Sequence, residues 1–314
     1  MRIHRTLVPG AALLALIISA CSPGGGGSPA ASGPAGSEAA GDLPTVTIAS
    51  APFWESAIVA EIYAQALEGA GFTVERQLEL GPREVTHAAI TSGEINMMPE
   101  YIGGYLGQAL DGTPTSDVDE THTALNEALS ELSLVSFEPT PGTDADGFAV
   151  RQETADELGI ATMSDLAEVA DQLTWGVAVE CTDNPNCGPG LNEIYGINLD
   201  ELEVETLSAC STAITDALNA SEIDVAQVCT TQPEIERNNL VLMEDDGGLA
   251  PAQNLVPVVT QELADEGGET LSSTLNAVSE LLTTEELTSL GAAIVLDGES
   301  YADAASQWLE DNGL

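Results

Sequence analysis

Residues 91–105 read TSGEINMMPEYIGGY, a short apolar run set between turn residues and glycines. The run Ile95–Met98 predicts a buried strand, because a few apolar residues bounded by turn signals are typical of a strand inside a parallel sheet. Pro99 and Glu100 favour the start of a helix, since proline is tolerated in the first helical turn. We therefore expect Tyr101 where the strand gives way to the helix, the place where open α/β sheets bind ligands.

The chain before this stretch predicts two further pairs of strand and helix. Residues 46–50 are an apolar, β-branched strand, and a helix is expected from about residue 52 to residue 68. Residues 72–80 alternate between apolar and polar side chains like a half-exposed strand, and a second helix is expected over 81–91. This order of elements predicts a right-handed, parallel α/β unit.

The composition changes after an expected acidic helix and a strand at residues 134–137. Residues 138–147 are rich in turn residues and show no periodicity, so we interpret them as a crossover into a second lobe. Short strands and helices follow as far as residue 229. Residues 261–314 carry apolar side chains at helical spacing, which predicts a helical C-terminal part with ordinary core packing.

The charge excludes one class of partner. The formal net charge is -46, and the six basic residues are all arginines. A surface this acidic repels nucleic acid and anionic lipid, so no nucleic-acid partner is expected. Two interpretations of the charge stay open, namely capture of cationic ligands and solubility in a salty exterior. The spread of acidic residues over every helix face favours the second.

The N-terminus predicts export from the cytoplasm. Arg2 and Arg5 form a basic region, and residues 7–18 form an apolar one. Residues 18–21, which read ISAC, resemble the lipobox at which bacterial lipoproteins are cleaved and acylated.

This pattern predicts a signal peptide over residues 1–20 and a lipid on Cys21, with an ordinary secretory signal as the alternative. Residues 21–43 consist mostly of Gly, Ser, Pro and Ala, so they predict a flexible tether with too few apolar residues to fold.

Four cysteines remain if Cys21 carries the lipid, and an oxidising compartment allows them to pair in three ways. The near neighbours would close a small loop, which favours Cys181–Cys187 with Cys210–Cys229. The spacings match no zinc pattern, so no metal is expected. Residues 144–147 resemble a fragment of a calcium loop but supply too few oxygen ligands for a full site.

The stretch around Tyr101 resembles a known family. A turn of small residues, a short strand and the Pro-Glu-Tyr-x-Gly segment at 99–103 are similar to those of ABC-importer substrate-binding proteins for glycine betaine, choline and related osmoprotectants. The resemblance runs from about Val46 to the C-terminus. It implies an α/β, two-lobed periplasmic-binding-protein fold, type II-like, in which the extended run 250–259 returns the chain to the first lobe.

The implied domain limits follow from these two crossovers. Residues 44–145 and 251–314 are expected to form lobe 1, and residues 146–250 to form lobe 2, with a two-segment hinge between them.

The resemblance also implies an aromatic cage. A quaternary ammonium donates no hydrogen bond, so ring faces recognise it, each worth roughly 0.5–2 kcal/mol. Tyr101 is the expected first wall. Phe53, Trp54 and Glu55 align with the first ligand loop, at a helix N-terminus, and Arg83 lies in the second. Core packing is the alternative for Trp54, and a surface position is the alternative for Arg83.

Lobe 2 and the crossovers are expected to supply the other contacts. Asp146 and Phe148 match the place where the family carries an aspartate and a second cage tyrosine. Thr230, Thr231 and Asn254 stand close to where two further cage tyrosines are expected. A phenylalanine keeps a ring face but loses the hydroxyl, and the aspartate offers charge to a cation.

Groups that hold a ligand carboxylate in the family are missing. The corresponding places are Ala51, Gly104 and the loop 183–186, where the family has a lysine, a threonine and an arginine. A carboxylate would have to rely on Arg83, on backbone N–H groups or on amides such as Asn254. This weakens betaine and leaves choline or another polar solute open.

The sequence thus predicts an extracytoplasmic, monomeric, lipid-anchored solute-binding protein of an ABC importer. It would capture choline, glycine betaine or a carnitine-type solute and deliver it to a permease whose ATPase is a separate chain. The alternative keeps the fold and the role but binds an amino acid or another small polar metabolite. A third hypothesis is a purely structural or adhesive lipoprotein. No cofactor and no enzyme activity is expected, because no catalytic constellation is assembled and His87 and His122 are expected on exposed helices.

Overall fold

The computed structural model describes residues 43–314. The predicted signal peptide, Cys21 and the predicted tether up to residue 42 lie outside the described residues. Among the residues described, no helix is both long and apolar enough to cross a membrane.

The first of two sheets contains five strands in the order β2-β1-β3-β10-β4. Strand β1 pairs in parallel with β2 and β3, whereas β10 runs antiparallel to β3 and β4. The elements of this part are β1 (Thr45–Ala49), α1 (Trp54–Gly69), β2 (Thr73–Gln77), α2 (Arg83–Ser92), β3 (Met97–Tyr101), α3 (Ile102–Ala109), α4 (Val118–Ser130), β4 (Leu134–Ser136), β10 (Leu255–Thr260), α10 (Gln261–Leu281), α11 (Thr284–Gly291), a π-helical turn (Ala292–Leu296) and α12 (Tyr301–Asn312).

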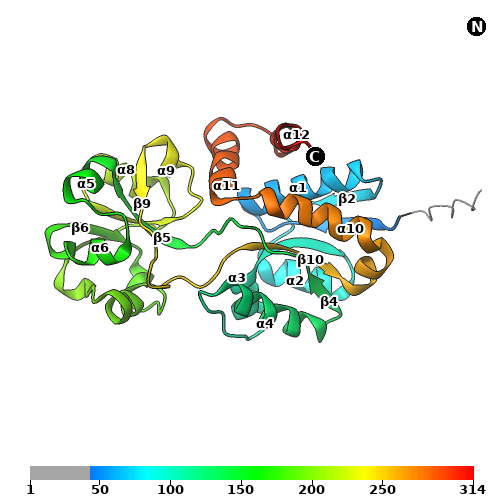
Figure 1. Cartoon of the computed structure of the whole chain (residues 1–314), viewed down its shortest axis with the longest axis horizontal. Coiled ribbons are helices and arrows are strands. Elements are labelled where there is room, and N and C mark those ends of the chain that lie inside the picture. Colours follow the sequence, from blue (N-terminus) through cyan, green and yellow to red (C-terminus); the bar gives the residue numbers. More distant parts are fainter. Residues whose placement is uncertain (1–42) are drawn as a thin grey trace, which may run out of the picture. The chain divides into compact units, whose positions relative to one another are not determined.

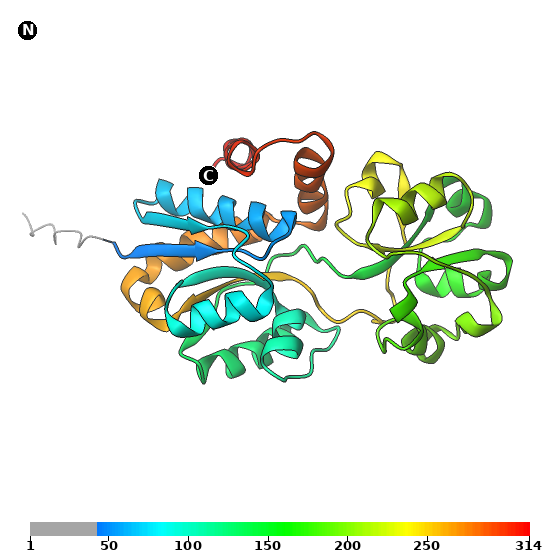
Figure 2. The same cartoon turned by 180° about the vertical axis from the view of Figure 1, so that it is seen from behind.

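The pleat of this sheet divides its side chains between two apolar cores. Met97 and Val259 face a core that includes residues of α1, α10, α11 and α12. Met98 and Val258 face the other core, with residues of α2, α3 and α4. Figure 2 shows α1 in blue and α2 in cyan on opposite sides of the strands. Helices on both faces bury the strands completely, which is why the run around Met97 is apolar without alternation.

The second sheet contains five strands in the order β7-β6-β8-β5-β9. Strand β6 is parallel to β7 and β8, and β5 is antiparallel to β8 and β9. Its strands and α-helices are β5 (Asp146–Arg151), α5 (Gln152–Leu158), α6 (Met163–Ala167), β6 (Thr174–Val177), α7 (Gly188–Gly190), β7 (Glu203–Thr206), α8 (Thr212–Asn219), β8 (Val225–Cys229), α9 (Glu234–Arg237) and β9 (Leu240–Leu242). Short 3-10 turns lie at Ala170–Gln172, Val179–Thr182 and Leu199–Glu201, and a π-helical turn lies at Leu191–Tyr195.

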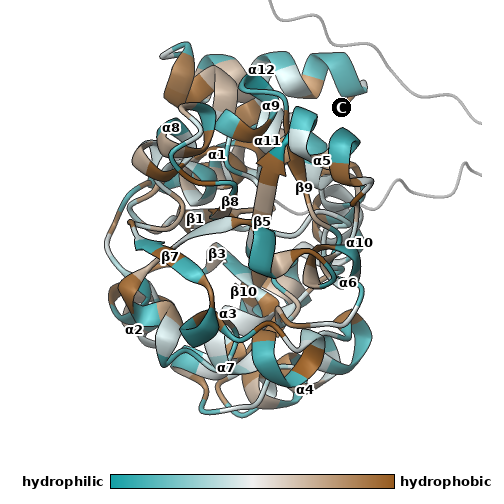
Figure 3. Cartoon of the chain, turned by 90° about the vertical axis from the view of Figure 1, so that its left-hand side faces the viewer, coloured by the Kyte–Doolittle hydropathy of each residue, from teal (hydrophilic) through white to brown (hydrophobic). Residues whose placement is uncertain are grey.

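Amphipathic helices cover both sheets. Figure 3 shows hydrophilic and hydrophobic stretches on the same outer helices, for example α4 and α12. In α4 the buried residues are Thr121, Leu125 and Leu129, spaced four apart, which is the helical period expected of a surface helix.

Two segments connect the sheets (Figure 1). The first runs from β4 to β5, and the second runs from β9 to β10. They touch through an isolated antiparallel bridge between Thr143 and Asn254. The α/β, two-lobed architecture is therefore confirmed, and the run ending in β10 does return the chain to the first sheet. The domain limits at 145/146 and 250/251 stay a prediction.

The prediction that a helix begins at Pro99 is wrong. Strand β3 continues through Pro99 and Glu100 to Tyr101, and α3 begins at Ile102. Proline is tolerated in this strand because β1 pairs with β3 at Met97, so the proline nitrogen lies beyond the β1 ladder. Tyr101 still lies at the junction of strand and helix, as predicted.

Other elements differ in smaller ways. Strand lengths differ from the prediction in both directions; the run 72–80, for example, is a strand only over β2, whereas β3 continues to Tyr101. Helices α5 and α9 were not predicted. His87 and His122 are half-buried rather than exposed, since they contact the hydroxyl oxygens of Tyr105 and Ser136. Both favoured disulfides are present, with S–S distances of 1.99 Å for Cys181–Cys187 and 2.07 Å for Cys210–Cys229.

The close approach of the second crossover to α3 gives a testable prediction. A Cβ atom on Gly103 would lie 2.4 Å from the carbonyl oxygen of Ala252, whereas one on Gly69 would meet nothing within 4 Å. Gly103→Ala should therefore lower the free energy of unfolding by about 1–3 kcal/mol through overpacking. Gly69→Ala, at the end of α1, is the matched control and should be neutral or mildly stabilising. Urea denaturation of both variants checks this, and equal stabilities would contradict the observed contact.

Candidate functional site

A cavity of about 350 Å³ opens in the first lobe where β3 ends and α1 and α2 begin. Its size suits a small solute of the kind that clefts of 300 Å³ and more enclose. Its walls combine aromatic rings, prolines and a few charged groups. The lining residues are Ala51, Pro52, Phe53, Ser56, Pro82, Arg83, Glu84, Thr86, Met98, Pro99, Glu100, Tyr101 and Gln108.

Two aromatic rings form one wall of this cavity. The rings of Phe53 and Tyr101 are stacked with centroids 6.2 Å apart and planes inclined by 25°. Tyr101 is 8% exposed, and Phe53 is 41% exposed because it caps α1 at the surface. The structure thus brings together two of the residues expected in the cage. Their ring faces offer the electron-rich surface that attracts a cation.

A buried glutamate lies at the hydroxyl end of this wall. Glu55 is 1% exposed, and its Oε1 accepts a hydrogen bond of 2.5 Å from the Tyr101 hydroxyl. Burial, and then the charge of Asp144, raise the pKa of Glu55 to about 8. Burial and the Glu55 charge also raise the pKa of Tyr101 well above its usual value. The pair is therefore a neutral hydrogen bond over most of the acidic range.

Asp144 is a site residue that the sequence analysis missed. It lies on the first crossover, where its backbone N–H donates to the Gln253 carbonyl oxygen at 3.2 Å. Burial raises its pKa, against hydrogen bonds from Thr231 that lower it. Asp144 lines a second cavity of about 330 Å³, together with Gln108 of the first cavity. Its signals in the sequence were its place in the crossover, two residues before Asp146, and the resemblance of residues 144–147 to a fragment of a calcium loop.

Arg83 is held by the protein itself. Its Nε and Nη2 atoms donate to both carboxylate oxygens of Glu100 at 2.9–3.1 Å, and Nη1 donates to Gln108 Oε1 at 2.7 Å. Burial alone would lower the pKa of Arg83, but the charge and hydrogen bonds of Glu100 raise it. A Cβ on Gly104 would lie 3.0 Å from Arg83 Nη2, so the glycine leaves room for the guanidinium. Arg83 lines the cavity as half of an ion pair.

The residues expected to bind the ligand from lobe 2 and the crossovers make hydrogen bonds within the protein. Thr230 Oγ1 donates to the Thr143 carbonyl oxygen at 2.8 Å and accepts from the Ala145 N–H at 3.0 Å. Asn254 Nδ2 donates to the Thr140 carbonyl oxygen at 2.9 Å. Thr231 is 1% exposed and lowers the pKa of the Asp144 and Glu55 carboxyl groups against the effect of burial.

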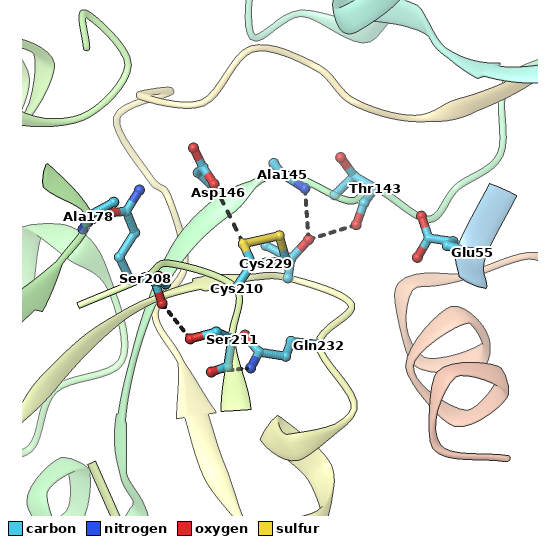
Figure 4. The surroundings of a disulfide bond; sticks show 12 residues. Glu55, Thr143, Ala145, Asp146, Ala178, Ser208, Cys210, Ser211, Cys229 and Gln232 are labelled. Atoms are coloured by element: carbon cyan, nitrogen blue, oxygen red, sulfur yellow. Dashed lines mark hydrogen bonds between the residues drawn. A yellow bond between two sulfur atoms is a disulfide. The ribbon is translucent and has the colours of Figure 1, made fainter. Parts of the chain in front are cut away.

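Three expected residues lie away from the first cavity. The Trp54 ring packs against Gly291 of α11 and the core of the first lobe. Phe148 is 3% exposed and meets Trp175 edge to face at 5.6 Å, inside the core of the second lobe. Asp146 is exposed beside the Cys210–Cys229 disulfide, as Figure 4 shows.

The geometry defines a solute-binding protein with two α/β lobes and a cavity at the carboxyl end of a buried strand. The family described as the substrate binding domain of ABC-type glycine betaine transport systems matches residues 44–311. The chain belongs to this family, and the resemblance seen in the sequence is confirmed. Its role is therefore to bind a small solute outside the cytoplasm for a permease, and it is not an enzyme.

Relatives support the same assignment. The chain is 24% identical over 268 residues to the glycine betaine-binding protein YehZ of Escherichia coli K12, covering 82% of this chain and 88% of that protein. It is 27% identical over 280 residues to the carnitine transport binding protein OpuCC of Listeria monocytogenes, covering 88% and 85%. A crystal structure of a glycine betaine/carnitine/choline ABC transporter protein shares the fold with a TM-score of 0.79 at 23% identity, covering 85% of this chain and 98% of that one.

The raised pKa of Glu55 predicts a pH-dependent stability. Between its ordinary pKa of 4.5 and about 8, the folded state holds a proton that the unfolded chain releases. The free energy of unfolding should therefore fall as pH rises through this window, by up to about 1.4 kcal/mol per pH unit from this group. Glu55→Gln should remove that share of the slope and gain stability relative to the parent at higher pH.

Urea denaturation of the parent and of Glu55→Gln between about pH 5.5 and 7.5 checks this. The control is Glu131→Gln, an exposed glutamate that changes the net charge by the same amount. Parallel curves for the parent and Glu55→Gln would show that Glu55 is ionised throughout.

Proposed function

We propose that this protein captures an ammonium-bearing osmoprotectant of the choline, glycine betaine or carnitine type and delivers it to an ABC permease. The observation that carries the proposal is the stacked pair Phe53 and Tyr101 on the wall of a small cavity, with Glu55 bound to the tyrosine hydroxyl. The names of the two relatives support this class of ligand.

The physical argument rests on what a methylated ammonium group needs. Such a group donates few or no hydrogen bonds, so binding relies on ring faces and on removal from water. Tyr101 is held rigidly because its ring packs in the first core and its hydroxyl is anchored on Glu55. A ring fixed in this way loses little side-chain freedom on binding. Phe53, which is more exposed, is the adaptable partner.

A second candidate keeps the role but changes the ligand to an amino acid or another small polar metabolite. Helices α1 and α2 both begin at the cavity, and their N-cap residues, Phe53 and Pro82, make no side-chain capping hydrogen bond. N–H groups at a helix start favour an anionic group such as a carboxylate. This observation supports a zwitterionic ligand, whether or not its nitrogen is methylated.

Delivery requires two conformations of which the ligand favours one. We place the hinges in the crossovers near Thr143 and Ala250. The Thr143 and Asn254 bridge and the Thr230 contacts would then be the fixed points about which the lobes turn.

The N-terminal sequence supports a lipid anchor. In the proposal, residues 1–20 are removed, Cys21 carries the lipid, and the monomeric protein stays on the outer face of the cell membrane. The permease and its ATPase are separate chains.

The first experiment is a thermal-shift titration with choline, glycine betaine, carnitine and proline. A ligand at about 100 times its dissociation constant should stabilise the protein by about 2.7 kcal/mol. Tyr101→Ala should abolish the shift because it removes the fixed ring face. Tyr101→Phe should retain most of it because only the hydroxyl is lost.

Tyr301→Ala is the control, since Tyr301 lies on α12 away from the cavity. Each variant is compared with its own unliganded melting temperature. A full shift in Tyr101→Ala would remove the aromatic wall from the proposal, and a shift with proline alone would favour the second candidate.

The anchor is tested by membrane fractionation of a bacterial host that expresses the full chain. Cys21→Ala should move the protein from the membrane fraction or leave it unprocessed, because the thiol that carries the lipid is absent. The same distribution for the parent and Cys21→Ala would contradict the lipobox interpretation.

A further inference from the structure

The second cavity, of about 330 Å³, adjoins the cavity that Tyr101 lines, because Gln108 of α3 lines both. Its lining residues come from both lobes and both crossovers, and none of them is Arg, Lys or His. Its polar lining consists of four amides and two carboxyl groups, which are Gln108, Asn184, Asn186, Gln253, Asp144 and Asp146.

Three of these amides have unused N–H donors. Gln108 Oε1 accepts from Arg83 Nη1 at 2.7 Å, and Gln253 Oε1 accepts from a backbone N–H of α3 at 2.9 Å. Asn184 Oδ1 accepts from the backbone N–H two residues later at 3.0 Å. Each of these partners is a donor only, which fixes the amide oxygen toward the protein. The NH2 groups have no partner among residues 43–314, so the cavity offers N–H donors to its contents.

One acceptor in the lining also lacks a partner. Oδ1 of Asp144 is buried and has no hydrogen bond among the described residues. A buried acceptor without a donor is costly, so it marks a place where a donor is expected. Asp144 lies close to the Tyr101 ring, because its charge follows burial and the charge of Glu55 in raising the pKa of Tyr101. The cavity therefore combines spare donors with a spare acceptor near the head-group site.

A hydroxyl group meets both requirements of this cavity. It donates one hydrogen bond and accepts others, so it can donate to Asp144 and accept from an amide. A carboxylate has no donor for Asp144 and would meet the charges of Asp144 and Asp146 with no cation in the lining. The quaternary nitrogen donates no hydrogen bond and is recognised by the ring faces of the first cavity.

We propose that the ligand carries a hydroxyl group on the second carbon from its quaternary nitrogen, as choline and carnitine do and glycine betaine does not. Asp144 accepts a hydrogen bond from this hydroxyl, and amides of the second cavity donate to it. The inference rests on the proposed function, which places the quaternary head group at Tyr101 and Phe53. Because Asn184 belongs to the second lobe and Gln108 to the first, a hydroxyl bound between them also favours closure of the lobes.

The competing explanation is that water satisfies the same groups. Water both donates and accepts hydrogen bonds, and it bridges polar groups in many binding sites. The second cavity would then hold solvent in every complex, and removal of the ligand hydroxyl would leave the affinity unchanged.

The test is isothermal titration calorimetry of the protein with two matched pairs of quaternary ligands. Choline is compared with propyltrimethylammonium, in which a methyl group replaces the hydroxyl. Carnitine is compared with γ-butyrobetaine, which is carnitine without its hydroxyl. In whichever pair binds, the hydroxyl member should bind about tenfold or more tightly, because its analogue leaves a charged acceptor and a donor unpaired. Glycine betaine is titrated beside them and should bind more weakly than choline.

Variants test the role of Asp144. Asp144→Ala should bring the two members of a pair to within about threefold, because the charged acceptor of the hydroxyl is gone. The ratio within a pair is the readout, since loss of a negative charge near the head group weakens both members alike. Asp171→Ala is the matched control, because Asp171 is exposed on a 3-10 turn of the second lobe and lies outside the cavity lining. It should keep the full ratio.

The outcomes separate the inference from the proposed function. A preference for the hydroxyl that Asp144→Ala loses and Asp171→Ala keeps supports the inference. Equal affinities within both pairs, or tightest binding of glycine betaine, overturn it and leave the proposed function in place. A preference that a folded Asp144→Ala variant retains, with folding checked by circular dichroism, overturns the assignment to Asp144. The parent pairs stand as a test even if this variant does not fold. Binding of none of these quaternary ligands overturns the proposed function, and the inference with it.

Discussion

The antiparallel pairing of β3 with β10 is the constraint on which the architecture depends. Five residue pairs, from Leu255 opposite Tyr101 to Val259 opposite Met97, join strands that are far apart in the sequence. The first sheet is complete only when β10, which follows the second sheet in the sequence, pairs with β3 and β4. Both crossovers must therefore run side by side, and the Thr143 and Asn254 bridge follows from that. The same pairing fixes the end of β3, and so the position of the Tyr101 ring.

Local sequence was enough to find the first lobe. Apolar runs without alternation indicate strands covered on both faces, and the run around Met97 follows this rule. The prediction of a helix start at Pro99 was wrong because proline is tolerated in two kinds of structure. It suits a first helical turn, but it also suits a strand whose neighbour stops short, and only the length of β1 decides between them. Short helices such as α9 carry too little periodicity to be recognised.

The site was predicted in part, and the failures share a cause. Tyr101, Phe53, Glu55 and Arg83 lie together because they end or begin elements that meet at one edge of the sheet. Phe148 has the right residue type, but its ring fills the core against Trp175. Asp144 was missed as a site residue, because burial of a crossover depends on the pairing of two distant segments. Sequence shows which groups a loop contains, whereas tertiary contacts decide which of them are buried.

The pairing of charges distinguishes Glu55 from the other buried glutamates of the described residues. In a chain this poor in arginine, a guanidinium beside a buried glutamate marks a group that the fold itself has compensated. Glu234, which is also buried, accepts from the Thr212 hydroxyl at 2.8 Å. Glu55 accepts a hydrogen bond from the Tyr101 hydroxyl. Thr231 lowers the pKa of Glu55, whereas the charge of Asp144 raises it. A proton on Glu55 relieves this arrangement over the acidic range, as the raised pKa of Glu55 indicates.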